Sequence, residues 1–284
     1  MRQGQEGEGK GTCDALMGRD QAVSRRELLA SLAVAVSARA ALAAVGTSRP
    51  ASRPADTIPW DDPPTDAVLG RVLYDGTPPV LAPVDCSADP NCAALYRHNP
   101  LLPEDLVVSK TGGLAHVFVS VKHGLDPGRR WPVPDRPVIL DQKGCLYIPH
   151  VFGVMAGQPL QILNSSKINE VPHGYPKRNP EFSFTLPKRG MSKTVVLNEP
   201  EVFRIGCDVH PWETAWCHVM AHPFFAVTDT EGRFMIRGLP AGEYELELWH
   251  EHATLGTLTR SVRIEAGRAA WLEEVRWSPL QQRQ

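Results

Sequence analysis

The chain has 284 residues, of which 42% are hydrophobic, and a formal net charge of −2 at pH 7. This composition is typical of one or two compact domains, and it excludes a strongly basic nucleic-acid-binding protein and a disordered charged tail. Proline is frequent, with 26 residues, and it gathers at 50–64 and 126–137, where it predicts loops instead of helices.

The N-terminal segment 1–43 is typical of an export signal. Arg25 and Arg26 precede a run of Leu, Ala and Val that carries no charge until Arg39. A paired arginine before a modest apolar core is the twin-arginine type of signal. The apolar run falls short of the roughly 20 residues needed to span a bilayer. We therefore expect a periplasmic or otherwise exported mature protein without a membrane span, beginning with a proline-rich linker over 44–66.

Beyond the linker, the chain reads as a series of short strands. No stretch shows a helical period, and short strands at this spacing favour sandwiches or barrels, so we predict an all-β fold. The runs rich in β-branched and aromatic residues, bounded by Gly, Pro, Asp or Asn, are 68–74, 115–121, 159–163, 202–205, 225–228, 233–236, 244–249 and 258–264.

The cysteines indicate both a disulfide and a free or metal-bound thiol. Of the six in the chain, Cys13 lies in the expected signal, which leaves an odd number in the mature protein. In an oxidising compartment at least one of these thiols is free, metal-bound or paired between molecules. We predict a disulfide between Cys145 and either Cys86 or Cys92, because all three lie in turn-like polar stretches.

The chemistry-bearing residues gather in the middle of the chain. Cys207 ends a predicted strand, and His210 follows three residues later. On the loop that leaves a strand, this spacing brings a thiolate and an imidazole within reach of one ion, and a third ligand from a distant loop would complete a trigonal site. The alternative is that Cys207 is a buried thiol or forms a disulfide with Cys217.

Four motifs between residues 141 and 229 carry a family resemblance: D-Q-x-G-C-x-Y-x-P-H-V, G-Q-x-L-x-I-x-N-S, C-D-V-H-P-W and H-P-F-F-A-V-T-D. With them the chain resembles the cupredoxins, and most closely the exported cupredoxin-like proteins labelled methylamine-utilisation proteins. The loop after Cys207 resembles the short C-x-x-H-P-x-M loop of the amicyanin type. The resemblance implies a cupredoxin-like Greek-key sandwich over 67–221 and a copper site with Cys207 and His210 as ligands.

Two positions depart from the family pattern. Glu213 replaces the axial methionine, and a hard anionic oxygen there would stabilise Cu(II) over Cu(I), lower the reduction potential and admit zinc. The upstream imidazole falls on Glu170 when the motif N-S-D-x-x-x-H-N-x-H is counted without gaps, and on His173 when the loop is longer. We take His173 as the ligand and Glu170 as the alternative, because the site needs an imidazole and no other histidine lies between His150 and His210.

The C-terminal part has the pattern of two consecutive hairpins. Asp229 and Gly232 bracket a tight turn, and alternating hydrophobic residues follow on both sides of a second turn. Residues 228–246 resemble the transthyretin-like sandwich of the carboxypeptidase regulatory-like family, whose signature is T-D-x-x-G-x-F-x-I-x-x-L-P-x-G-x-Y. The resemblance implies a structural module without catalytic residues over 222–277.

The segment 67–125 admits two assignments. It either begins the cupredoxin-like domain 67–221, or it supplies the opening strands that the transthyretin-like family normally has before its Thr-Asp turn. In the second case the central domain is inserted into a split C-terminal sandwich.

These features predict an exported copper-binding protein that acts in one-electron transfer or copper handling, with His210 near the surface facing a redox or copper-donor protein. The alternative is a non-metal β-sandwich module that binds a partner of the cell envelope. An enzyme is not expected, because the sequence has no G-x-S-x-G, H-E-x-x-H or phosphate-binding glycine loop. Neither a small-molecule substrate nor a nucleic acid is indicated.

Overall fold

The computed structural model of this protein describes residues 62–279, and the structural statements below concern that part of the chain. The expected signal 1–43 and most of the expected linker 44–66 lie outside these residues. The described part contains no helix long and apolar enough to cross a membrane.

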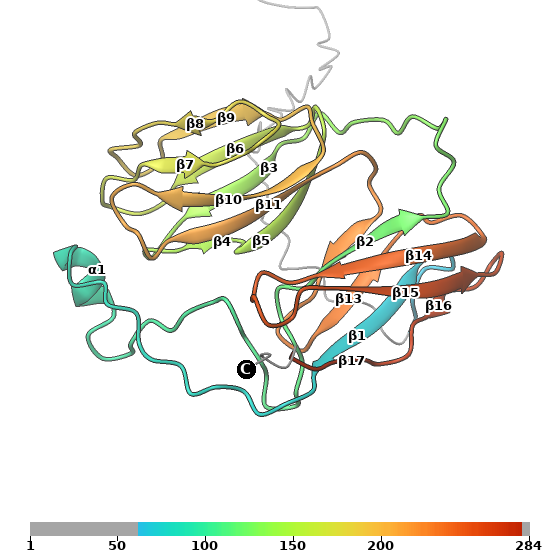
Figure 1. The fold of residues 1–284 in the computed structure, drawn as a ribbon. Coiled ribbons are helices and arrows are strands. Elements are labelled where there is room, and N and C mark those ends of the chain that lie inside the picture. The colour runs from blue at the N-terminus through green and yellow to red at the C-terminus, as the bar shows by residue number, and fades with distance from the viewer. Residues whose placement is uncertain (1–61, 280–284) are drawn as a thin grey trace, which may run out of the picture. The chain divides into compact units, whose positions relative to one another are not determined.

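The described part is almost entirely β, which confirms the predicted fold class. Seventeen short strands are arranged in four sheets, and the sheets form two sandwiches (Figure 1). One short helix, α1 (Pro90–Leu95), stands among the strands. Asp89 caps this helix by accepting hydrogen bonds from the N–H groups of Asn91 and Cys92, and Pro90 stands in the first turn. At six residues, α1 is too short to show a helical period in the sequence.

The central sandwich consists of nine consecutive strands, β3 to β11, in two sheets (Figure 1). The first sheet has the order β5 (Val151–Met155), β11 (Thr214–Met220), β10 (Glu201–Cys207), β7 (Pro172–Gly174) and β8 (Phe182–Ser183). The second sheet has the order β4 (Tyr147–Ile148), β3 (Val138–Gln142), β6 (Pro159–Asn164) and β9 (Ser192–Val196).

A hydrophobic core fills the space between these two sheets. Along β6 every second residue is buried, which is the period of a strand with one face turned inward. The core includes Leu160 and Ile162 from this strand, and it also includes Cys207 and Cys217 from β10 and β11. The thiol of Cys207 is therefore part of the sandwich core, at the end of its strand, instead of being displayed on the surface.

The second sandwich combines strands from both ends of the described chain. β1 (Val68–Tyr74) pairs with β13 (Arg233–Ile236), β16 (Ala270–Trp271) and β17 (Val275–Trp277). In the other sheet, β2 (Phe118–His123) lies between β12 (Phe225–Val227) and β14 (Gly242–Trp249), and β15 (Thr257–Ile264) forms the edge. The segment 67–125 thus contributes β1 and β2 to the C-terminal sandwich, and the central sandwich begins at β3 instead of at residue 67.

The central sandwich is inserted between two strands that are neighbours in the second sandwich. β2 ends at His123 before the insertion, and β12 begins at Phe225 after it. These two strands pair antiparallel, with Phe225 opposite Ser120. Because the outgoing and returning connections start from adjacent strands, the insertion leaves the hydrogen bonding of the host sheet intact.

Candidate metal centre

The candidate site lies at the end of β10, in the loop that leads to β11. Cys207 is the last residue of β10, and the loop 208–213 connects it to its antiparallel neighbour. Within this loop the backbone N–H of Glu213 donates to the carbonyl of His210 at 3.0 Å. The turn folds the loop so that three side chains, those of Cys207, His210 and Glu213, converge on one place.

Glu170 reaches the same place from the chain that leads into β7. Its N–H donates to the carbonyl of Leu186 at 3.1 Å, and its carbonyl accepts from the N–H of Leu186 at 2.7 Å. The next residue, Val171, donates its N–H to the sulfur of Cys207 at 3.4 Å and accepts from the N–H of Asp208 at 3.0 Å. Backbone contacts on both sides therefore fix Glu170 beside the thiol.

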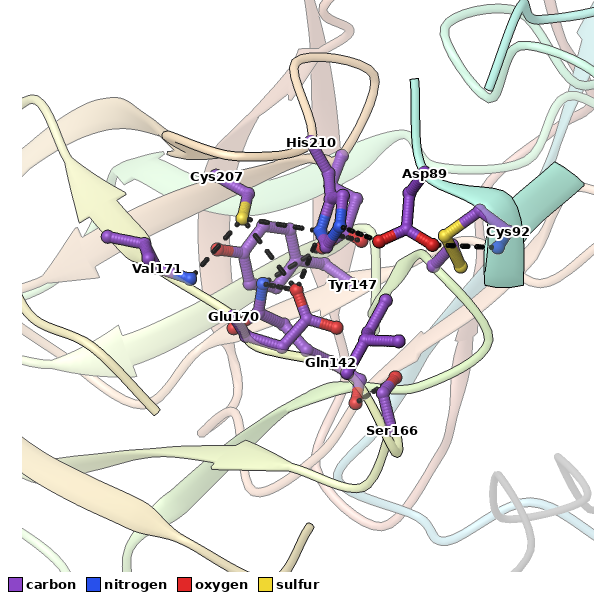
Figure 2. Close-up of polar contacts among 12 residues, drawn as sticks. Asp89, Cys92, Gln142, Tyr147, Ser166, Glu170, Val171, Cys207 and His210 are labelled. Atoms are coloured by element: carbon purple, nitrogen blue, oxygen red, sulfur yellow. Dashed lines mark hydrogen bonds and ion pairs between the residues drawn. A yellow bond between two sulfur atoms is a disulfide. The ribbon is translucent and has the colours of Figure 1, made fainter. Parts of the chain in front are cut away.

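Four potential ligand atoms from Glu170, Cys207, His210 and Glu213 lie within 4.8 Å of one another. His210 Nδ1 is 2.9 Å from Glu170 Oε2, 3.2 Å from Glu213 Oε1 and 3.7 Å from Cys207 Sγ. The side chains are withdrawn from solvent, with exposed fractions of 0% for both glutamates, 2% for His210 and 6% for Cys207. Figure 2 shows the His210 ring with Cys207 and Glu170 on one side and Asp89 on the other.

The structure places His173, the preferred upstream ligand, on the other face of the sheet. Pro172 is the Cα partner of Cys207, so these two side chains share a face, and the side chain of His173 points to the opposite one. There His173 Nδ1 lies 2.8 Å from Asp208 Oδ1, and its Nε2 lies 2.6 Å from Glu181 Oε1. Burial opposes a charge on His173, but the two carboxylates raise its pKa above the ordinary range. His173 is therefore paired with acids and is absent from the Cys207 cluster, whereas the alternative, Glu170, is part of it.

Gln142, the last residue of β3, connects the two buried carboxylates. Its Nε2 donates to Glu170 Oε2 at 3.1 Å and to Glu213 Oε2 at 2.8 Å, and the whole residue is buried. Sequence reasoning did not give Gln142 a role, although it stands in the D-Q-x-G-C motif. The motif includes Gln142, but only the fold shows that the end of β3 lies at the site.

The electrostatics of the cluster are dominated by its two glutamates. Burial opposes a charge on His210, but hydrogen bonds with Cys207, Glu170 and Glu213 outweigh burial and raise the pKa of His210 to about 12. Burial raises the pKa of Glu213, and the neighbouring charge of Glu170 adds to that effect, although His210 opposes it. Burial also raises the pKa of Tyr147 well above its ordinary value, and its hydroxyl donates to the carbonyl of Gly206 at 2.8 Å. The phenol thus supports the end of β10 as a neutral donor.

The cluster fits a divalent transition metal. Glu170 Oε1 and Gln142 Oε1 are buried and have no hydrogen-bond partner among residues 62–279, which is costly unless a cation satisfies them. Two carboxylates, an imidazole and a thiol are ligand types of Zn²⁺ and Cu²⁺. The cluster contains one imidazole where the trigonal blue-copper arrangement has two, so it does not reproduce that arrangement.

The other cysteines leave the Cys207 thiol available. The predicted disulfide of Cys145 forms with Cys92. Cys86, Cys207 and Cys217 are free and buried, so the alternative disulfide between Cys207 and Cys217 does not form. Burial raises the pKa of Cys217 well above its ordinary value, which keeps this core thiol neutral.

No known protein family matches this chain, and no curated protein is similar enough in sequence to count as a relative. Among solved structures, the copper-containing nitrite reductase of Thermus scotoductus SA-01 shares 17% identity over 34% of this chain, with a TM-score of 0.27. An oxidized single-residue variant of amicyanin shares 18% identity over 31% of this chain and 86% of its own, with a TM-score of 0.28. A purple cupredoxin from Nitrosopumilus maritimus shares 18% over 30% of this chain and 100% of its own, with a TM-score of 0.25.

This chain spans 25% of the length of that nitrite reductase. Likenesses this weak indicate nothing about the metal or the activity of this chain. The chemistry of the site is therefore judged from its own four side chains, Glu170, Cys207, His210 and Glu213.

Proposed function

We propose that this chain is an exported copper-binding protein whose centre is formed by Glu170, Cys207, His210 and Glu213. One observation supports it above all: four potential ligand atoms lie within 4.8 Å of one another, and the buried Glu170 Oε1 has no hydrogen-bond partner within residues 62–279. When bound, copper would supply one-electron redox chemistry, and the thiolate of Cys207 would be its soft ligand. The proposal gives the chain a role in electron transfer or copper handling and assigns no catalysed reaction.

The two glutamates determine how the reduction potential of the centre would differ from that of a blue-copper site. Anionic oxygen donors stabilise Cu(II) relative to Cu(I), so Glu170 and Glu213 favour a low reduction potential. Both carboxylates are preorganised, because the amide of Gln142 holds one oxygen of each. Strong retention of the oxidised ion suits copper handling at least as well as electron transfer.

A second candidate is favoured by the way the cluster balances its own charges. A protonated His210 lies 2.9 Å from Glu170 and 3.2 Å from Glu213, so the three form a buried ion cluster without any metal. In that case the cluster would only fix the loop 208–213, and the protein would be a β-sandwich module that binds a partner of the cell envelope.

Metal binding by the purified protein separates the two candidates. The protein is loaded with Cu(II) or Zn(II), dialysed, and assayed for bound metal, visible absorption and electron paramagnetic resonance. We expect about one copper per chain and an intense thiolate-to-copper band. The band should be lost in Cys207→Ala and kept in Cys217→Ala, which removes a buried thiol outside the cluster.

Each other outcome has a definite meaning. If the protein retains zinc and not copper, the proposed metal is zinc, held by the same four ligands. Retention of neither metal would overturn the proposal. The site would then be a buried ion cluster that binds no metal.

A further inference from the structure

A loop between β1 and β2 covers the edge of His210 that faces away from the cluster. The loop 84–101 contains α1 and is closed at its base, where the N–H of Val84 donates to the carbonyl of Leu101 at 2.8 Å. From this loop Asp89 places Oδ2 at 3.4 Å from His210 Nε2 (Figure 2). His210 is consequently buried and does not present its edge to solvent, contrary to the expectation from the sequence.

The two oxygens of Asp89 have different partners. Oδ1 accepts from the N–H of Asn91 at 2.7 Å, from the N–H of Cys92 at 3.2 Å and from the side-chain amide of Asn91 at 3.1 Å. These contacts anchor the carboxylate at the first turn of α1 and leave Oδ2 directed at His210. The orientation of the Asp89 carboxylate is therefore fixed.

The two nitrogens of His210 are divided in the same way. Nδ1 faces Glu170, Cys207 and Glu213, and Nε2 faces Asp89. A histidine that binds a metal through one nitrogen usually donates the N–H of the other to a carboxylate or carbonyl, and that partner fixes the tautomer and the ring orientation. Asp89 occupies the place of such a partner. Its contact at 3.4 Å is longer than an ordinary N–H···O hydrogen bond.

The loop is fastened to the hairpin that also carries Gln142. Cys92 of α1 is joined by a disulfide to Cys145, three residues after Gln142. Beside it, the hydroxyl of Tyr96 donates to the carbonyl of Gly144 at 2.5 Å. Cys86, Cys92 and Cys145 form a small buried cluster against which Trp212 packs, two residues beyond His210.

We infer that Asp89 is the positioning residue of His210, and that the Cys92–Cys145 disulfide holds Asp89 in place. The inference rests on the proposed function in one respect, because Nδ1 is taken as the metal-binding nitrogen. It adds to that function a carboxylate from a loop 121 positions away in sequence and a covalent link that keeps the loop closed over the site.

The test compares Asp89→Asn with Asp85→Asn in the full protein. Asparagine is as good a helix cap as aspartate, so Asp89→Asn keeps α1 and removes the charge that faces His210. Asp85 lies in the same loop, is exposed and bonds with Ser87, so its substitution is a matched control. We expect Asp89→Asn to weaken Cu(II) binding in chelator competition about 10- to 100-fold and to raise the reduction potential, with Asp85→Asn unchanged. Equal affinities and potentials in the two variants would overturn the assignment.

The role of the disulfide is tested with the double variant Cys92→Ala/Cys145→Ala. Both cysteines are replaced because Cys86 lies in the same buried cluster and could pair with whichever one remained. If the disulfide acts through Asp89, the double variant loses copper affinity, and adding Asp89→Asn to it changes the affinity by less than about threefold. Independent, multiplying losses would show that the disulfide does not act through Asp89. Should the double variant not fold, Asp89→Asn alone decides the main point.

A measurement on the metal-free protein keeps this inference separate from the proposed function. Nitrogen-15 NMR of the imidazoles should show a slowly exchanging His210 Nε2–H proton that shifts in Asp89→Asn and not in Asp85→Asn. A wild-type protein that shows this pattern but binds no copper or zinc would contradict the proposed function and retain the assignment of Asp89. A Nε2–H signal that is identical in all three proteins would overturn the assignment, whether or not copper binds.

Discussion

The carboxylates of Glu170 and Glu213 are fully buried and face the same atom, His210 Nδ1, at 2.9 and 3.2 Å. Glu170 precedes β7 and Glu213 precedes β11, so only the folded sheet brings the two side chains together. Two buried carboxylates this close disfavour each other's charge unless a cation lies between them. A protonated imidazole can be that cation in the metal-free protein, and a divalent metal can replace it. This relation makes the upstream ligand testable.

We predict that Glu170→Gln weakens metal binding at least tenfold, while His173→Ala leaves it within about twofold of wild type. Glu170 lies inside the cluster, whereas His173 faces the other side of the sheet and is engaged with Asp208 and Glu181. Competition titrations with Zn(II) and Cu(II) measure both variants. A large loss of metal affinity in His173→Ala with no loss in Glu170→Gln would contradict the proposed ligand set. His173 would then be the upstream ligand, as the family pattern implies.

Gln142→Met should destabilise the metal-free protein by about 1–3 kcal/mol, because it removes the donor shared by two buried carboxylates and keeps a side chain of similar size. Urea unfolding of the metal-free protein measures the free energy of unfolding. Gln161→Met is the matched control, since Gln161 bonds with Ser192 at the surface and its loss should matter by less than about 0.5 kcal/mol. Equal stabilities in the two variants would show that the amide does not support the carboxylates.

Local sequence patterns were sufficient for part of the fold and part of the site. The predicted strands 68–74 and 233–236 coincide with β1 and β13, because each is a short β-rich run closed by turn residues. Cys207, His210 and Glu213 lie within one loop, so their convergence depends on local chain geometry. β11 was missed because apolar residues stand on both of its faces: Ala215, Cys217 and Val219 are buried, and Trp216 and Met220 are half-buried on the other face, so the sequence shows no simple alternation.

The rest of the site depends on contacts that no local pattern encodes. The choice between Glu170 and His173 depends on the register of β7 against β10, where a shift of one residue exchanges the two faces. The need of a blue-copper site for a second imidazole favours His173, but the pairing of Pro172 with Cys207 turns His173 away. Asp89 is 121 positions from His210, and the Asp-Pro start of α1 indicates only a cap.

Loss of the Cys92–Cys145 disulfide should lower the free energy of unfolding by about 2–4 kcal/mol. The cross-link joins residues 53 positions apart, so it removes much of the freedom of the unfolded chain. Denaturation of wild type with and without a thiol reductant measures the effect. Cys86→Ala, which removes a thiol outside the disulfide, is the control and should keep the reductant sensitivity of wild type. A reductant effect below about 0.5 kcal/mol would mean that the bond adds little to global stability.

We expect His218 to make the free energy of unfolding depend on pH in acid. Its ring stacks on Phe118 with centroids 3.7 Å apart and meets Trp249 edge-on at 4.6 Å, and its Nε2 has no hydrogen-bond partner within residues 62–279. Burial therefore lowers the pKa of His218 from 6.5 to about 3. Between these two values the unfolded chain binds a proton that the folded protein does not, so the free energy of unfolding falls as the pH falls through that window.

His218→Phe keeps an aromatic ring between Phe118 and Trp249 and removes the site of protonation. From pH 7 to about pH 4.5, wild type should lose about 2 kcal/mol more stability than this variant, as measured by urea unfolding at each pH. Burial also lowers the pKa of His116 and His250 to about 4, but both proteins share that contribution, so it cancels in the difference. His98→Phe, at an exposed position, should follow wild type at every pH. If His218→Phe loses as much stability in acid as wild type, the buried ring is protonated in the folded state, and the contact of β11 with β2 is more accessible to solvent than its packing indicates.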